Sequence, residues 1–110
     1  MDDIMNQGVV GALAFGKAKA KTQEEWARDL ERIWDRSTGM LLKQKGFRGL
    51  RAFWAADGSR DTMVMGIWET MDDRMAYERS VSPGVQGAFD EILEARARRQ
   101  KFILVKRTVY

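Results

Sequence analysis

The alternation of apolar and polar positions predicts four strands, of which residues 62–69 are the most informative. Both alternating sets of side chains in this stretch are apolar: Met63, Met65 and Ile67 form one set, and Val64, Gly66 and Trp68 form the other. A strand with one face in water alternates apolar with polar residues. We therefore expect this strand to be covered on both faces.

Three further stretches are substantially apolar on both alternating faces and are predicted to be strands: residues 8–20, 47–55 and 101–110. Between the second and third strands stands the pair Asp57-Gly58, which tolerates the positive φ of a tight turn. This pair predicts a hairpin that joins residues 47–55 to residues 62–69.

A long amphipathic helix is predicted to begin at Thr22 and to stop at Gly46, a residue type that often ends helices. Thr22 and Glu25 fit the capping box, in which hydroxyl and carboxylate bond to each other's free backbone N–H groups. The apolar positions recur at helical spacing: Trp26, Leu30, Ile33, Trp34 and Leu41. We interpret this stripe as core, because an amphipathic helix needs that spacing to bury one face.

A second helical region is predicted in two pieces. Thr70 and Asp73 cap a short helix over residues 71–79. Ser82 and Pro83 begin another helix, with proline at the first position, where its missing N–H costs nothing. The second piece has an apolar stripe of its own: Val85, Ala88, Phe89, Ile92 and Leu93.

The order strand, helix, strand, strand, helix, strand predicts an α+β fold of the ferredoxin-like βαββαβ type, formed by residues 1–110 as a single domain. In such a fold a four-stranded antiparallel sheet has its helices on one face. The strands are nevertheless apolar on both faces, and monomers rarely expose a large apolar surface. We therefore predict a homodimer that packs through the open sheet face.

Composition narrows the chemistry further. The 110 residues are 45% apolar and include neither cysteine nor histidine, so disulfides, thiolate chemistry and the commonest metal ligand are excluded. The remaining carboxylates form no convincing metal cluster, since Asp72 and Asp73 begin a helix and Asp57 and Asp61 flank a turn. The first residues carry two acids where an export signal carries positive charge, and no apolar run is long enough to cross a bilayer. We expect a cytoplasmic protein without a bound metal.

Basic residues are concentrated near the C-terminus. From Glu94 onward there are six basic residues and one acid. We interpret this run as a solvated helix end and an edge strand, where Lys and Arg discourage edge-to-edge pairing. A footprint for an anion or a nucleic acid is the alternative.

Two motifs for phosphate or nucleic-acid binding are present only in part. Residues 11–17 have the spacing of GxxxxGK, but Ala18 stands where Ser or Thr would hold magnesium, and the glycines lie inside a predicted strand. Lys45-Gly46-Phe47 begins an RNA-recognition signature that breaks at Arg48 and falls on the second strand rather than the third. We predict that the chain binds no nucleic acid.

With this element order in place, KQKGFRG (residues 43–49) and GIWETMDDRMAYERS (residues 66–80) resemble the antibiotic biosynthesis monooxygenase superfamily. The resemblance implies a dimeric α+β barrel. It also implies that Trp68 matches a strand tryptophan that faces the barrel cavity, and that Tyr77 stands where many members carry His. The haem-degrading branch needs that His, whereas the quinone-forming branch oxidises polycyclic phenols with O2 and no cofactor.

Four residues are candidates for contact with a small aromatic ligand: Trp68, Tyr77, Trp54 and Arg51. Gly66 beside Trp68 leaves room above the sheet for a ligand, although packing in a dimer core is an alternative role for Trp68. The alternation of the second strand puts Trp54 and Arg51 on opposite faces, so both cannot line one cavity.

Two functions remain open for the chain. One is a cofactor-independent monooxygenase acting on an aromatic, polyketide-like small molecule. The alternative is a non-catalytic dimer on the same scaffold that binds a small hydrophobic or aromatic ligand or serves as an accessory protein.

Overall fold

The computed structural model describes residues 9–80 and 82–108, without the side chains of residues 35–39 and 82. Seven elements follow one another along the chain: β1 (Val10–Lys17), α2 (Gln23–Leu42), β2 (Phe47–Trp54), β3 (Asp61–Trp68), α3 (Met71–Ser80), α4 (Ser82–Asp90) and β4 (Arg98–Ile103). Their order is the predicted βαββαβ order, with the second helical region divided into α3 and α4 as expected.

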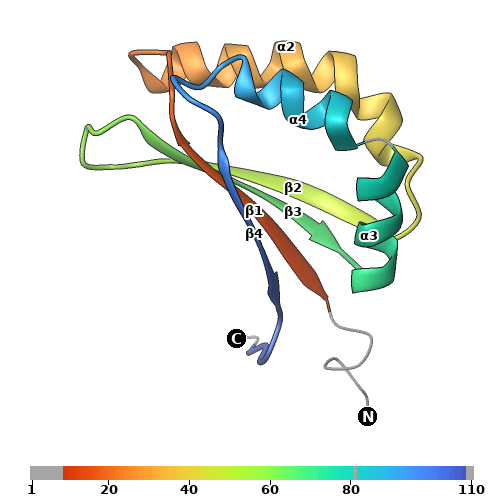
Figure 1. Ribbon diagram of the computed structural model, residues 1–110. Helices are drawn as coiled ribbons and strands as arrows, with labels where there is room; N and C mark the ends of the chain where they lie inside the picture. The colour runs from red at the N-terminus through yellow and green to blue at the C-terminus, as the bar shows by residue number, and fades with distance from the viewer. Residues whose placement is uncertain (1–8, 81, 109–110) are drawn as a thin grey trace.

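The four strands form one antiparallel sheet in the order β2-β3-β1-β4. The helices α2 and α4 lie along one side of this sheet, and α3 stands across its end near Trp68 (Figure 1). The predicted fold class, a ferredoxin-like α+β arrangement with helices on one face, is confirmed.

Two strands have different limits from those predicted. β1 ends at Lys17 rather than Ala20, because the chain beyond it pairs with the α4–β4 connection: Ala18 forms a bridge with Leu93, and the Lys19 N–H donates to the Ile92 carbonyl. β4 covers residues 98–103 rather than 101–110, because its partner β1 begins at Val10, opposite Ile103. The ends of both predicted strands, residue 8 and residues 109–110, lie outside the described residues.

The buried core lies between the sheet and the helices and has two parts. One part surrounds Trp68 and includes Val10, Ala12, Leu41, Tyr77 and Val85. The other surrounds Trp26 and includes Ala18, Ala20, Ile33 and Ile92. The even-numbered residues of β1 and β3 therefore face the helices, and the tryptophan stripe of α2 is core as predicted.

Local capping sets the helix boundaries. The backbone N–H of Glu25 donates to the Thr22 hydroxyl at 3.1 Å, and that of Asp73 donates to the Thr70 hydroxyl at 3.0 Å. α2 ends at Leu42, four residues before the predicted stop. Gly46 instead adopts a φ of 83° in the turn that follows, close beneath the first turn of α3.

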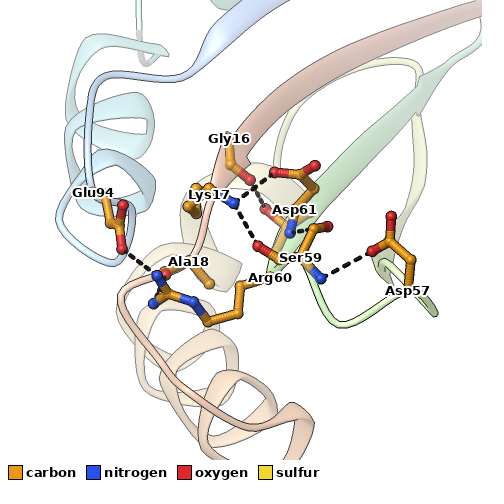
Figure 2. A network of polar contacts seen from close by, with 9 residues as sticks. Gly16, Lys17, Ala18, Asp57, Ser59, Arg60, Asp61 and Glu94 are labelled. Carbon is orange, nitrogen blue, oxygen red and sulfur yellow. Dashed lines mark hydrogen bonds and ion pairs between the residues drawn. The ribbon is translucent and has the colours of Figure 1, made fainter.

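The end of the sheet farthest from Trp68 is fastened by polar contacts between the β2–β3 hairpin and the α4–β4 connection (Figure 2). The Arg60 guanidinium donates to the Ala18 carbonyl at 3.0 Å and to Glu94 at 2.7 Å. Lys17 binds the Ser59 carbonyl and lies 3.3 Å from Asp61. These contacts join segments far apart in the sequence, and we assign them a structural role.

Among residues 9–80 and 82–108, no helix lies against the other face of the sheet (Figure 1). The alternation of the strands places a mostly apolar set of side chains there: Leu13, Phe15, Phe53, Met63, Met65, Ile67 and Phe102. We call these residues the open face. Phe53 and Phe102 on its edge strands are 47% and 44% exposed.

Candidate functional site

A small apolar cavity lies beneath the helices at the Trp68 end of the sheet. It measures about 60 Å³ and lies between strand residues on one side and helix residues on the other. Its floor includes Ala12, Ala14 and Gly66, and its roof includes Tyr77 and Phe89. The small residues of β1 and β3 leave this space, because larger side chains at those positions would fill it. We call it the inner cavity.

Trp68 forms one wall of the inner cavity and is completely buried. Its indole packs against Phe47 and Tyr77, with ring centroids 5.2 and 4.9 Å away, respectively. A Cβ placed on Gly66 would lie 3.4 Å from the indole nitrogen, so that N–H is next to the glycine. Within the described part of the chain the nitrogen has no hydrogen-bond partner.

An unpartnered buried N–H is costly, because it has lost its hydrogen bond to water without a replacement. Buried polar groups in native proteins are nearly always paired, so each exception calls for an explanation. Here the unpaired donor borders a cavity, and the absence of a side chain on Gly66 keeps the space beside it open. The indole N–H is therefore available to donate a hydrogen bond to an oxygen atom of a molecule bound in the cavity.

Arg74 on α3 extends over the same aromatic cluster. Its guanidinium carbon is 4.9 Å from the centre of the Tyr77 ring and 5.7 Å from that of Trp68, which are favourable distances for a cation above aromatic rings. Its Nε donates to Glu78 at 2.8 Å. The two terminal nitrogens have no hydrogen-bond partner among residues 9–80 and 82–108, although the side chain is only 13% exposed.

A second, polar space adjoins the inner cavity and shares five lining residues with it: Ala12, Leu13, Arg74, Gln86 and Arg99. It measures about 150 Å³, and its remaining lining residues are polar: Glu78, Gln100 and Lys101. We call it the outer pocket. It lies between α3, α4 and β4, so a molecule in the inner cavity can extend a polar group into it.

Ion pairs organise the outer pocket. Glu78 binds Arg74 at 2.8 Å and Lys101 at 2.9 Å, and Asp90 binds Arg99 at 2.9 Å. Burial by itself would raise the pKa of Glu78, but the hydrogen bonds and charges of Arg74 and Lys101 outweigh it and lower that pKa. Glu78 is therefore an anion at neutral pH and is not suited to take up a proton.

A third space, wholly different in character, lies between α2 and β2. It measures about 390 Å³ and is lined mainly by apolar side chains, among them Leu30, Trp34 and Leu42. It shares Phe47, Leu50 and Phe89 with the inner cavity. Those three side chains form the partition between the two spaces, and we call the larger one the apolar pocket.

The structure brings together two of the four predicted site residues. Trp68 and Tyr77 are in contact at the inner cavity. Trp54 lies in the other part of the core, against Trp26 at 5.8 Å, and Arg51 lies on the side of the open face. As the strand alternation predicts, Trp54 and Arg51 do not share a cavity.

Sequence reasoning did not identify Arg74, Gln86 and Arg99 as site residues. Arg74 precedes Tyr77 by three positions on α3, a spacing that places two side chains on the same helix face, so a signal for it was present. The position of Arg99 depends on where β4 begins, and the predicted strand started two residues after it. Gln86 had no signal of its own.

Two negative findings apply to the described residues. No group of three or more carboxylates is placed to hold a metal ion within residues 9–80 and 82–108. Across the same residues, each helix is too short or too polar to span a membrane.

Comparison with known proteins identifies the fold. No protein-family model matches the chain, and no curated protein matches it. A protein from Bordetella bronchiseptica, assigned as an antibiotic biosynthesis monooxygenase, has a similar structure: TM-score 0.64, 15% identity, 94% of this chain and 100% of that chain covered. A Caulobacter crescentus protein with the same assignment has a TM-score of 0.65 at 14% identity, over 92% of this chain and 93% of its own.

SnoaB, a cofactor-independent oxygenase from Streptomyces nogalater, is similar as well. Its TM-score is 0.59 at 14% identity, with 93% of this chain and 96% of SnoaB covered. At such identities the likeness establishes a shared fold. The chain thus has the fold of the antibiotic biosynthesis monooxygenase proteins, and the predicted resemblance is confirmed at that level.

Proposed function

We propose that this chain, with the fold of the antibiotic biosynthesis monooxygenases, binds a small planar aromatic molecule beneath its helices and oxidises it with O2 without a cofactor. The unpaired indole N–H of Trp68, beside Gly66 in an apolar cavity, is the observation that carries this proposal. A ligand oxygen that accepts this hydrogen bond would remove the cost of the unpaired donor.

The size of the spaces limits where such a ligand lies. A cavity known to hold benzene is about 150 Å³, so the inner cavity of about 60 Å³ is too small for a ring by itself. A ring must extend into the outer pocket, or displace the Phe47 and Phe89 partition toward the apolar pocket. Both directions keep one edge of the ring against Trp68.

The chemistry needs an electron-rich anion and a site that stabilises it. A phenol or enol that loses its proton can pass an electron to O2, and the two radicals combine to a hydroperoxide. Loss of water from the hydroperoxide converts the ring CH2 to a ketone, so that CH2 and O2 give C=O and H2O. The N–H of Trp68 and the charge of Arg74 lie where they favour the anionic form of the ligand.

The site has no evident general base in the described part of the chain. Glu78 and Asp90 are both held in ion pairs, and the pKa of Glu78 is lowered. The chain would therefore act by lowering the pKa of an already acidic substrate, with water taking the proton. The same observation favours the second candidate, a protein that binds the aromatic ligand and does not transform it.

Oxygen uptake with anthrone, corrected for its spontaneous oxidation, and calorimetric binding of 2-naphthol separate the two candidates. Uptake above the background supports the oxygenase, and binding without uptake supports the binding protein. A protein that shows no oxygen uptake and no naphthol binding would reject both candidate functions.

Trp68→Phe provides a specific variant, since it keeps an aromatic ring and removes the N–H. We expect it to lower the rate or the affinity by about tenfold, the order of one lost hydrogen bond. Trp26→Phe is the matched control, because Trp26 is also buried with an unpartnered indole N–H but lies in the other part of the core.

We further propose that two copies pack through the open face. Its apolar side chains cover the centre of the sheet, and beside them lies a hollow of about 860 Å³ lined in part by Leu13, Met65 and Phe102. Burial of this surface against a second copy would remove it from water. Light scattering at micromolar concentration should give twice the chain mass of 12.6 kDa.

Met63→Glu places a charge between Phe15 and Phe53 on the open face, and we expect it to give the monomer mass. Ala27→Glu, on the exposed side of α2, is the control and should leave the dimer intact. A monomeric wild-type protein at these concentrations would contradict the proposed dimer.

A further inference from the structure

The outer pocket holds more positive than negative charge. Its lining includes three cations, Arg74, Arg99 and Lys101, and one carboxylate, that of Glu78. A second carboxylate, that of Asp90, does not line the pocket but forms an ion pair with Arg99. The described part of the chain thus leaves one net positive charge at a place where the charged side chains are between 13% and 34% exposed. A partly buried excess charge is unfavourable unless an anion joins it.

The three cations differ in how much of their hydrogen-bonding capacity is used. Arg99 donates to Asp90 and to the carbonyl of Gln86, and Lys101 donates to both oxygens of Glu78. Arg74 uses only Nε, again toward Glu78. Its two terminal nitrogens are the unused donors, and Arg74 lines both the inner cavity and the outer pocket.

We propose that the outer pocket is a carboxylate subsite, and hence that the ligand is an aromatic acid. Its ring would lie against Trp68 and its carboxylate would accept hydrogen bonds from the terminal nitrogens of Arg74. Guanidinium and carboxylate match in this way through two parallel N–H···O bonds. Gln86 lines the same pocket from α4. This inference rests on the proposed binding of an aromatic molecule beneath the helices.

The test compares 2-naphthoate with 2-naphthamide at pH 7 by calorimetry. The two molecules have the same rings and nearly the same shape, but only the first carries a charge. We expect the wild-type protein to bind the acid about tenfold to a hundredfold more tightly, the usual advantage of a hydrogen bond to a charged group.

Arg74→Met should abolish this preference while changing the affinity for the amide much less. Glu78 keeps both contacts to Lys101 in this variant, so no carboxylate is left unpaired. Arg74→Lys, which keeps the charge without the planar fork, should retain part of the preference. Arg79→Met is the matched control, because Arg79 lies exposed on the same helix.

The outcomes separate this inference from the proposal on which it rests. Equal binding of the two probes by the wild-type protein, or an unchanged preference in Arg74→Met, would overturn the carboxylate subsite and leave aromatic binding standing. If the wild-type protein binds neither 2-naphthoate nor 2-naphthamide, both the carboxylate subsite and the proposed aromatic binding are overturned. The wild-type comparison decides the matter even where a variant fails to fold.

Discussion

A methyl group on Gly66 should stabilise the fold and at the same time weaken ligand binding. Gly66 lies inside β3, and a Cβ there would meet the indole nitrogen of Trp68 at 3.4 Å and the Ala12 carbonyl at 3.9 Å, which are ordinary contacts. Replacing a strand glycine by alanine where the backbone permits it adds about 0.4–1 kcal/mol. For a domain of this size, Gly66→Ala should therefore raise Tm by roughly 2–6 °C.

The same methyl group enters the inner cavity next to the unpaired N–H of Trp68. One extra methylene in a binding pocket changes affinity by about tenfold or more. We expect Gly66→Ala to bind 2-naphthol at least about tenfold more weakly, although the protein itself is more stable.

Gly11→Ala is the matched control for this experiment. Gly11 lies on β1 on the opposite face of the sheet, where a Cβ would also make ordinary contacts, 3.4 Å from Leu13 and 3.5 Å from Met65. It should show a similar change in Tm with no loss of naphthol binding. Thermal unfolding by circular dichroism and calorimetry measure the two quantities. A stable Gly66→Ala protein with undiminished affinity would refute the inner cavity as the ligand site.

Two further predictions concern stability. Gly46→Ala should destabilise the fold by about 2–4 kcal/mol, because the residue has a φ of 83° and its Cβ would lie 2.7 Å from that of Asp73. Gly58→Ala is the control, because Gly58 has a similar φ of 81° but no atom near its added Cβ. It should lower the free energy of unfolding, measured by denaturant titration, by only about 1 kcal/mol. If the two variants lose the same free energy of unfolding, the contact between residue 46 and α3 is refuted as the cause. The lowered pKa of Glu78 stabilises the fold above the ordinary value of 4.5, and this stabilisation is lost as the pH falls through the folded-state pKa. The free energy of unfolding should thus differ most between wild type and Glu78→Gln near pH 7 and converge in acid, and a gap that widens in acid would contradict the assignment.

The element order and fold class were predictable from the sequence because they depend on local patterns. The cap at Thr22, the stripe of α2 and the two-sided apolar strand at residues 62–69 each involve neighbours within a few positions. The boundaries were less predictable. β4 begins at Arg98 because β1 lies opposite, and a pairing between residues some ninety positions apart has no signature within the strand itself.

The site was predictable only in part. The placement of a tryptophan beside a glycine on one strand face follows from alternation, and Tyr77 follows from the resemblance. The placement of Trp54 and Arg51 on opposite faces of the sheet was likewise predictable, because successive side chains of a strand alternate between the two faces. None of these patterns indicates that the indole N–H of Trp68 lacks a partner, because that depends on which side chains of α3 and α4 reach it.

The sequence by itself determined an α+β chain with four strands, capped helices and a sheet that is apolar on both faces. Only the tertiary structure decided that Arg74 from α3 and Arg99 from β4 line one cavity with Trp68, and that the terminal nitrogens of Arg74 are left unused there. The physical reason is the distance along the chain between the residues that interact. Backbone periodicity and capping act between near neighbours, whereas a cavity and its charge balance arise where elements distant in the chain pack together.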